Sequence, residues 1–208
     1  MNSLLKVTRA IPSTKTQLLR VACYFFFTLG IFALGYAGFV YADSHAYQAL
    51  EMRKIRQADR LAGPRVLGEG DVIGEIQVPR LGLSAIVVQG GSSANLRRAV
   101  GHLSKSALPG QWGNVALAGH RDTFFRPLRD IQVGDEIRFK TPERSFEYVV
   151  EFIEVVAPRD IRVLEPSSGH ELTFITCFPF HYVGPAPKRF VVRAREVDWT
   201  PRNELARN

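Results

Sequence analysis

Short apolar runs separated by turn residues fill the sequence from Asp71 onward. Each run has the length and the Val, Ile, Phe and Tyr content typical of a β-strand, with Gly, Pro, Ser or Asp between runs. Many short strands with few helices predict a β-sandwich or a closed β-barrel. The predicted strands are Val72–Val78, Ser84–Val88, Asn114–Ala118, Glu136–Phe139, Phe146–Val156, Glu171–Thr176 and Phe190–Val197.

Two short segments between these runs favour helix. Ser93 is placed to cap a helix over Asn95–Val100, because a serine side chain accepts a hydrogen bond from a backbone amide of the first turn. The segment Phe124–Asp130 predicts one or two helical turns despite Pro127. We therefore expect a mainly β domain with one or two short helices.

The segment Val21–Ala42 is a run of twenty-two residues without a charge. As a helix it spans about 33 Å, enough to cross a hydrocarbon core of about 30 Å. The preceding segment has no acidic residue, and its basic residues predict a cytoplasmic N-terminus. A cleaved signal peptide is the alternative, but its apolar core is usually about 7–15 residues long. The basic residues are Lys6, Arg9, Lys15 and Arg20.

The sequence thus predicts a single-pass protein of the cell membrane whose folded domain lies outside the cytoplasm. Between the anchor and the strands, the polar stretch has loose helical spacing and suggests a stalk whose apolar side packs on the domain. The predicted parts are a cytoplasmic tail (1–20), a transmembrane anchor (21–42), a juxtamembrane stalk or helix (43–69), a folded domain (70–197) and a C-terminal tail (198–208).

The net charge of +7 is concentrated near the predicted membrane segment. Residues 66–208 contain eighteen Lys and Arg against seventeen Asp and Glu, a balance of only +1. Basic flanks of a membrane span favour a defined topology and anionic lipid headgroups. A nucleic-acid-binding domain would carry the basic residues itself, so we expect a lipid bilayer and no nucleic acid among the partners.

Cys177 follows the apolar run Glu171–Thr176 in the domain predicted to be exported. Exported cysteines are usually paired in disulfides. The only other cysteine, Cys23, lies in the predicted membrane segment and is not an available partner. Cys177 is therefore either an inert buried thiol in a domain that only binds, or a nucleophile.

Two further polar residues stand at the ends of apolar runs. His120 follows Val115–Ala118, and Arg189 opens the run Phe190–Val192. If these strands are neighbours, His120, Cys177 and Arg189 converge at one edge of the sheet. An imidazole beside a thiol acts as a base or stabilises the thiolate. A fixed guanidinium stabilises the oxyanion formed in acyl transfer. The set therefore predicts an acyl-transfer site.

The segments that carry these residues resemble those of sortases. Thr173-Phe174-Ile175-Thr176-Cys177 is similar to the family's Thr-Leu-x-Thr-Cys motif, with Phe174 in the Leu place. The order His, Cys, Arg and the spacings of 57 and 12 residues also fit. The resemblance covers roughly residues 70–197, and the further matching segments are Gly74–Leu81, Ala107–Gly110, Asn114–Arg121 and Pro187–Val192. The phrase Cys177–Gly184, with the N-terminal anchor, looks most like a class D sortase.

The resemblance implies an eight-stranded sortase-type β-barrel and a cysteine transpeptidase. The enzyme would cleave a sorting signal of the Leu-Pro-x-Thr-Gly type after its Thr. Cys177 would form a thioester with the Thr carbonyl, His120 would act as general acid and base, and Arg189 would stabilise the oxyanion or position the substrate. The implied partners are secreted or membrane-attached proteins with a C-terminal sorting signal, and an amine acceptor of the cell envelope.

Other residues near these positions are weaker candidates. His102 reads as a local structural or groove residue, and His181 as part of a loop that walls the groove. Arg193 and Arg195 share the face of Arg189, but Arg193 lies about 13 Å farther along the strand at ~3.3 Å per residue. Arg121 would point away from the base in an extended run. Thr176 reads as a β-forming residue, placed beside the thiol where its hydroxyl can bond substrate, and Asp122 reads as a turn or cap.

Two enzymatic alternatives also fit an exported cysteine. An L,D-transpeptidase has a His shortly before its Cys, but no His lies in the six residues before Cys177. In a papain-like peptidase the Cys opens a helix, whereas Cys177 closes a predicted strand. Neither Glu143 nor Glu165 belongs to a metal-binding pattern, and no Cys/His cluster has zinc spacing, so we expect no metal and no cofactor.

Overall fold

The computed structural model describes residues 14–57, 67–165, 168–182 and 184–197. A long helix α1 (Thr14–Gln57) precedes eight strands and one further α-helix, α2 (Ser93–Arg98). The chain divides into two compact units, residues 1–43 and 44–208. The strands are β1 (Val72–Val78), β2 (Leu83–Gln89), β3 (Val100–His102), β4 (Gly113–Ala118), β5 (Glu136–Lys140), β6 (Ser145–Val156), β7 (His170–Phe178) and β8 (Lys188–Glu196).

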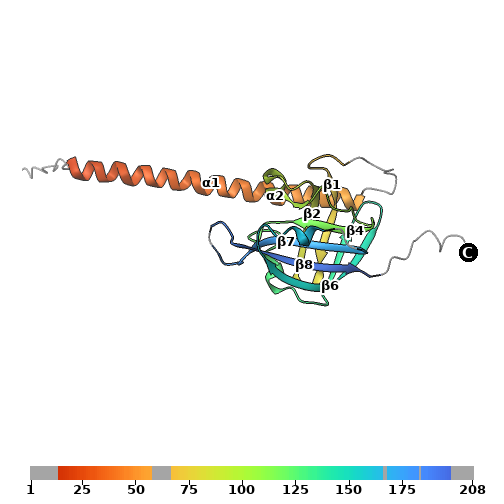
Figure 1. The fold of residues 1–208 in the computed structure, drawn as a ribbon. Coiled ribbons are helices and arrows are strands. Elements are labelled where there is room, and N and C mark those ends of the chain that lie inside the picture. Colours follow the sequence, from red (N-terminus) through yellow and green to blue (C-terminus); the bar gives the residue numbers. More distant parts are fainter. Residues whose placement is uncertain (1–13, 58–66, 166–167, 183, 198–208) are drawn as a thin grey trace, which may run out of the picture. The chain divides into compact units, whose positions relative to one another are not determined.

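The eight strands form a closed barrel, in the order β1-β2-β3-β4-β7-β8-β6-β5 (Figure 1). Two neighbouring pairs, β2 with β3 and β4 with β7, are parallel, and the other pairs are antiparallel. The predicted mainly β fold with an eight-stranded barrel is confirmed. Because β4 and β7 are parallel, their carboxyl ends lie at the same edge of the barrel wall.

β3 was not among the strands predicted from apolar runs. The predicted helix Asn95–Val100 with a Ser93 cap is wrong at both ends. Ser92 is the N-cap, and its side chain accepts a hydrogen bond from the Asn95 amide. The helix ends at Arg98 because Ala99 is extended, and Val100 then pairs with Val87 of β2. Three residues are too few to show the alternation that marks a strand.

Three short 3-10 helices complete the described chain. These are η1 (Pro79–Leu81), η2 (Arg126–Asp130) and η3 (Ile161–Leu164). The predicted helical segment Phe124–Asp130 corresponds to η2, with Pro127 in its first turn, where a missing N–H costs no hydrogen bond. η3 lies in the connection between β6 and β7, which the sequence analysis left without structure.

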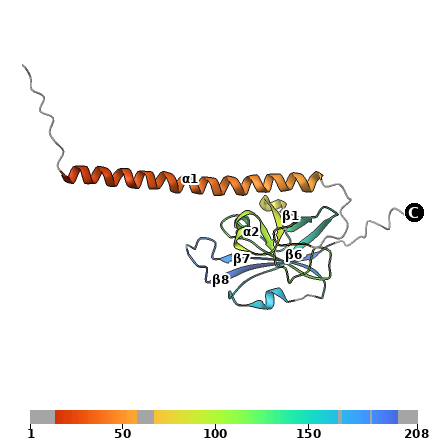
Figure 2. The same cartoon turned by 90° about the horizontal axis from the view of Figure 1, so that it is seen from above.

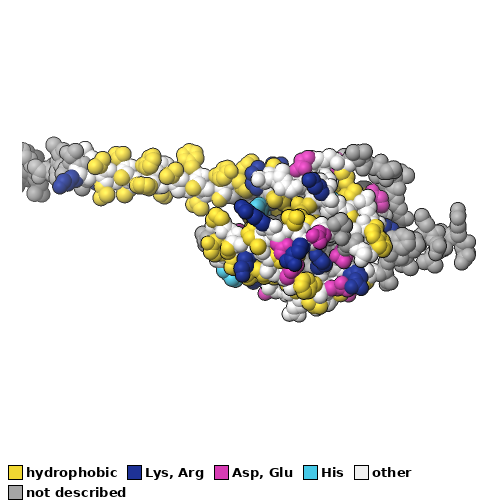
Figure 3. All heavy atoms as spheres, in the orientation of Figure 1, with side chains coloured by type: hydrophobic (Ala, Val, Ile, Leu, Met, Phe, Trp, Pro, Cys, Tyr) yellow, Lys and Arg dark blue, Asp and Glu magenta, His cyan; other side chains and the backbone are white. Residues whose placement is uncertain are grey.

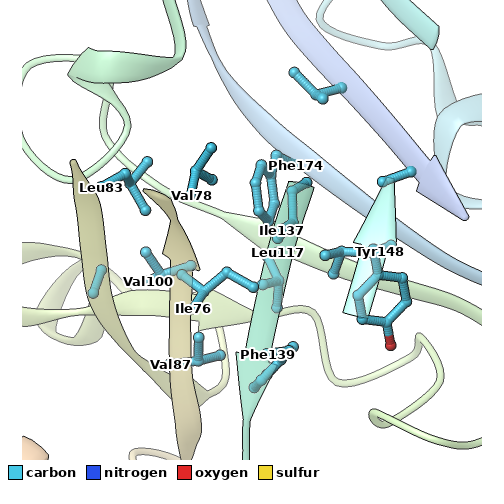
Figure 4. Close-up of a cluster of buried hydrophobic side chains, with 14 of the residues drawn as sticks. Ile76, Val78, Leu83, Val87, Val100, Leu117, Ile137, Phe139, Tyr148 and Phe174 are labelled. Carbon is cyan, nitrogen blue, oxygen red and sulfur yellow. The ribbon is translucent and has the colours of Figure 1, made fainter. Parts of the chain in front are cut away.

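The barrel interior is a single apolar core. Side chains from opposite sides of the barrel, among them Ile76, Leu117, Phe139 and Phe174, point toward one another in Figure 4. The ring of Phe125 also belongs to this core and lies 5.1 Å from that of Phe174, centroid to centroid. A Cβ on Gly119 would come within 2.7 Å of the Phe125 ring, so only glycine fits directly before His120.

The last part of α1, from Ser44, belongs to the same compact unit as the barrel. The Gln48 side chain accepts a hydrogen bond from the Ile86 amide of β2 at 2.7 Å and donates one to the Arg98 carbonyl at 2.6 Å. Tyr47 and Met52 pack against the small cluster of Ile86, Val88 and Ala99. The predicted packing of the stalk on the domain is thus present through Tyr47 and Met52, whereas Leu50, another apolar residue of the stalk, is exposed.

The N-terminal part of α1 carries large exposed apolar side chains from Val21 to Tyr41, seen as hydrophobic atoms along the helix in Figure 3. The helix is long and apolar enough to cross a membrane, judged by its length and composition (Figure 2). The predicted stalk continues this helix as far as Gln57. Two predicted segments lie outside the described residues: residues 58–66 of the stalk and residues 198–208, the predicted C-terminal tail.

Candidate active site

Cys177 and Arg189 are direct cross-strand neighbours. The antiparallel register of β7 and β8 pairs Cys177 with Arg189. Such pairs have Cβ atoms about 4.5–5.5 Å apart, with both side chains on the same face of the sheet. Leu172 and Phe174 of β7 point into the core, so Cys177 projects from the outer face by alternation. The Cys177 thiol is free and partly exposed.

His120 lies two residues after Ala118, the last residue of β4. β4 and β8 are the two strands that flank β7 in the barrel. The parallel register pairs Ala118 with Ile175, so two more residues along both segments bring His120 level with Cys177. Two bonds extend this alignment beyond the strand: the Gly119 amide donates to the Ile175 carbonyl at 3.2 Å, and the Thr176 hydroxyl donates to the Gly119 carbonyl at 2.7 Å. The three predicted residues therefore come from three neighbouring strands at one barrel edge.

The face beside Cys177 is apolar. Ile175 and Val191, the next outward-facing pair, pack with Val156 and Val163 in a cluster outside the main core. Val163 belongs to η3, whose neighbours Ile161 and Leu164 are exposed. The thiol and the guanidinium thus stand beside a mostly buried apolar cluster, and the apolar side chains accessible there are those of Ile175, Ile161 and Leu164.

A buried polar network holds η3 on the barrel. Asn114 of β4 donates a side-chain hydrogen bond to the Val163 carbonyl at 3.1 Å and accepts one from the Thr173 hydroxyl at 2.7 Å. Asn114 and Thr173 are both buried. Because buried polar groups are costly unless they are paired, this network fixes the position of η3 along β4 and β7.

Arg121 does not lie in the extended run that the sequence predicts after His120. The chain turns after His120 instead of continuing as an extended run, and the Arg121 side chain is only 7% exposed. Its guanidinium donates to the carbonyls of Pro179, Tyr182 and Gly184, in the connection between β7 and β8. No sequence motif marks main-chain carbonyls some sixty residues away as its partners.

The competing histidines differ in their surroundings. His102 is buried: its Nδ1 lies 2.8 Å from the Gln89 amide oxygen, and its Nε2 lies 2.9 Å from the Ala107 carbonyl and 3.0 Å from the Ser106 hydroxyl. Burial lowers the pKa of His102, and the hydrogen bond to Ala107 partly opposes this. With both ring nitrogens occupied, His102 is a structural residue. His181 is exposed in the connection after Cys177.

The competing arginines of β8 have acidic partners. Arg193 lies 3.7 Å from Glu171, and Arg195 lies 2.7 Å from Glu151. Arg189 instead donates to the carbonyls of Lys188 at 3.0 Å and Ala186 at 3.3 Å. Within residues 14–57, 67–165, 168–182 and 184–197, no carboxylate forms an ion pair with Arg189. Its charge is thus the least neutralised of the three.

Other predicted roles can be compared with the geometry. The Thr176 hydroxyl donates to the Gly119 carbonyl, so it ties the strand that carries Cys177 to the segment that carries His120. Asp122 is exposed and lies 3.5 Å from the Arg121 guanidinium. Across the described ranges, no group of three or more His, Cys, Asp or Glu side chains is arranged to hold a metal ion.

A closed barrel with a free thiol, an imidazole and a guanidinium on three neighbouring strands is the architecture of a cysteine transpeptidase. The sortase domain family model matches residues 76–197, and the chain therefore belongs to the sortase family. Sortase D of Bacillus subtilis is 27% identical over 195 residues, covering 86% of this chain and 98% of the relative. Sortase A of Bacillus anthracis is 29% identical over 155 residues, 72% of each chain.

Solved sortase structures share the barrel. A Clostridium perfringens sortase D5 transpeptidase is 25% identical with a TM-score of 0.62, and the match covers 76% of this chain and 99% of that one. A lid mutant of sortase A from Corynebacterium diphtheriae is 26% identical with a TM-score of 0.59, covering 79% and 98%. The family expected from the sequence, including its likeness to class D sortases, is confirmed.

Proposed function

We propose that this chain is a membrane-anchored sortase in which Cys177 is the nucleophile, His120 the general acid and base, and Arg189 the oxyanion donor. It cleaves a Leu-Pro-x-Thr-Gly-like sorting signal after Thr and transfers the protein to an amine of the cell envelope. The observation that carries the proposal is the register that pairs Cys177 with Arg189 and brings His120 level with them.

The reaction proceeds by two acyl transfers. The Cys177 thiolate attacks the Thr carbonyl carbon, and the oxygen becomes an oxyanion beside the Arg189 guanidinium. The C–N bond to Gly then breaks as protonated His120 gives its proton to the leaving amine. In the second step an acceptor amine attacks the thioester, His120 takes the amine proton, and Cys177 leaves as a thiolate.

The apolar surface beside the thiol supports a signal that begins with Leu and Pro. Ile175 is partly exposed beside the thiol, and Ile161 of η3 is 72% exposed, so these two side chains can contact a peptide bound at Cys177. Burial of an aliphatic side chain against them contributes about 1.5–3 kcal/mol, which favours an apolar residue at the head of the signal.

The acyl-enzyme is the species that tests this proposal. The full chain in detergent micelles is mixed with a fluorescent Leu-Pro-Glu-Thr-Gly peptide, quenched in acid and digested for mass spectrometry. The peptide containing Cys177 should gain the mass of the acyl fragment ending at Thr, in the wild type and in Cys23→Ala. An adduct that survives Cys177→Ala would reject Cys177 as the nucleophile.

The membrane arrangement is part of the same proposal. The exposed apolar helix and its four preceding basic residues support a single span with the N-terminus inside and the barrel outside. Protease added to spheroplasts should digest the barrel and spare an N-terminal tag. Recovery of a mature chain that begins near Asp43 or Tyr47 would instead mean a cleaved signal peptide.

A further inference from the structure

Arg121 connects all three segments of the proposed site without belonging to the catalytic set. It directly follows His120 in the chain. Its guanidinium donates to the Pro179 carbonyl at 2.9 Å, to the Tyr182 carbonyl at 2.5 Å and to the Gly184 carbonyl at 3.2 Å. Pro179 lies two residues after Cys177, and Gly184 lies five residues before Arg189.

These bonds use the particular geometry of a guanidinium. Arginine presents five N–H donors in a rigid plane, whereas a lysine ammonium has three donors at one point. Nη1 of Arg121 reaches the carbonyl of Pro179, the first residue of the connection, and Nη2 reaches that of Gly184 near its middle. The guanidinium lies 5.9 Å from the centroid of the Tyr182 ring. The nearby Asp122 carboxylate is exposed, so the carbonyls are the main partners of the buried charge.

Aromatic packing holds the same connection from the barrel side. The rings of Phe178 and Phe180 lie 6.1 Å and 5.2 Å from that of Phe190, centroid to centroid. Phe180 and Phe190 also pack against the main core. These contacts fix the connection on β7 and β8. Among the hydrogen bonds of the described residues, those of Arg121 are the ones that join the main chain of this connection to the segment that carries His120.

We propose that Arg121 is a positioning residue that locks the connection between β7 and β8 to the segment of the general base, so that His120, Cys177 and Arg189 are held in reactive alignment. It touches neither substrate nor the reacting atoms. The assignment of its effect to catalysis rests on the proposed function, whereas its hold on the connection is independent of it.

Arg121→Met and Arg121→Lys test the catalytic part. A misplacement of about 1 Å in an active site costs on the order of 100-fold in rate. We therefore expect Arg121→Met to lower kcat/KM about 100-fold at a temperature well below its Tm, mainly through kcat, because Arg121 acts on the alignment of the reacting groups and forms no hydrogen bond to η3. Arg121→Lys keeps the charge but not the fork, and should recover only part of the loss.

Arg80 supplies a matched control. Its guanidinium also holds a turn, through both oxygens of Asp135 and the Asp130 carbonyl, but η1 lies on the opposite side of the barrel order from β7. Arg80→Met should lower the Tm and leave kcat/KM unchanged. If Arg121→Met behaves in the same way, Arg121 is merely structural and the proposal is overturned.

Hydrogen exchange tests the connection without any substrate. The Tyr182 amide donates to the Pro179 carbonyl at 3.3 Å, and Arg121 binds that same carbonyl. In the full chain in micelles, the peptide containing Tyr182 should exchange faster in both Arg121 variants and at the wild-type rate in Arg80→Met. Unchanged exchange would overturn the proposal. If exchange is faster in the Arg121 variants but the wild type forms no acyl-enzyme, the proposed function is rejected while the hold of Arg121 on the connection stands.

Discussion

Two connections wall the proposed site, and the barrel holds each of them differently. The connection between β6 and β7 is held by neutral groups: the Asn114 side-chain amide donates to the Val163 carbonyl and accepts a hydrogen bond from the Thr173 hydroxyl, and both side chains are buried. The connection between β7 and β8 is held by a buried charge, since Arg121 binds three carbonyls. Both anchors come from β4 or the turn that follows it.

At this edge of the barrel the main chain of each connection is fixed, while some of the side chains of the connection stay exposed. In both connections the barrel binds main-chain carbonyls, so Ile161, His181 and Tyr182 remain exposed for contact with a substrate. The neutral anchor, Asn114, fixes η3 beside the partly exposed Ile175 and the thiol. The charged anchor, Arg121, fixes the segment that joins Cys177 to Arg189, the proposed nucleophile and oxyanion donor, where a displacement should have a larger effect on the rate.

Loss of the thiol between the two connections should have the largest effect. Cys177→Ala removes the only nucleophile proposed here, so peptide cleavage, amine transfer and acyl-enzyme should all fall below detection. His120→Ala should lower turnover by several orders of magnitude. The fluorescence assay and intact-mass measurement check both. Cys23→Ala is the control, and loss of activity in it would contradict the assignment.

Replacement of the guanidinium paired with Cys177 should have the next largest effect. Arg189→Lys keeps the charge but changes the donor geometry, and we expect kcat/KM to fall about 10²–10³-fold, as after loss of one oxyanion donor. Single-turnover kinetics should show slower acylation. Arg193→Lys, whose partner is Glu171, should be nearly neutral. A crippled Arg193→Lys with an active Arg189→Lys would move the oxyanion role to Arg193.

Disruption of the neutral anchor should act on binding and stability more than on chemistry. Asn114→Ala leaves the Thr173 hydroxyl and the Val163 carbonyl without their partner, which costs about 1–3 kcal/mol of unfolding free energy. The shifted wall should raise KM with kcat nearly unchanged. Thr173→Val removes a single bond and should be milder. Urea denaturation and steady-state kinetics distinguish this pattern from that of Arg121→Met.

The smallest expected effect concerns pH and His102. Burial lowers the pKa of this histidine, so the fold favours its neutral form, and stability from it is present above the unfolded pKa of about 6.5. As pH falls below that value, the wild type should lose unfolding free energy relative to His102→Gln, which does not titrate. Urea unfolding of both chains between about pH 8 and about pH 5 measures this. Parallel curves would mean that His102 titrates equally in both states.

The strands were readable from sequence because each long run alternates or is continuously apolar, as in Phe146–Val156. β3 was not, because its three residues are recognisable only beside β2. His120, Cys177 and Arg189 could be predicted as site residues because each stands at the end or the start of such a run. Arg121, Asn114 and Thr173 were not recognised, because their partners are a main-chain carbonyl or an amide distant in sequence. Only the folded barrel brings these groups together.

The bond from Gln48 to Ile86 has a practical meaning for anyone who prepares a soluble form of this enzyme. The pairing of β2 with β3 does not extend beyond Val87 to Ile86. The Ile86 backbone amide donates instead to the side-chain oxygen of Gln48 on α1, which takes the position that a longer β3 would fill. A truncation after Gln57 would leave that backbone amide and the apolar patch of Ile86, Val88 and Ala99 bare to solvent. A cut that removes the exposed apolar part of α1 therefore belongs before Ser44, inside the helix.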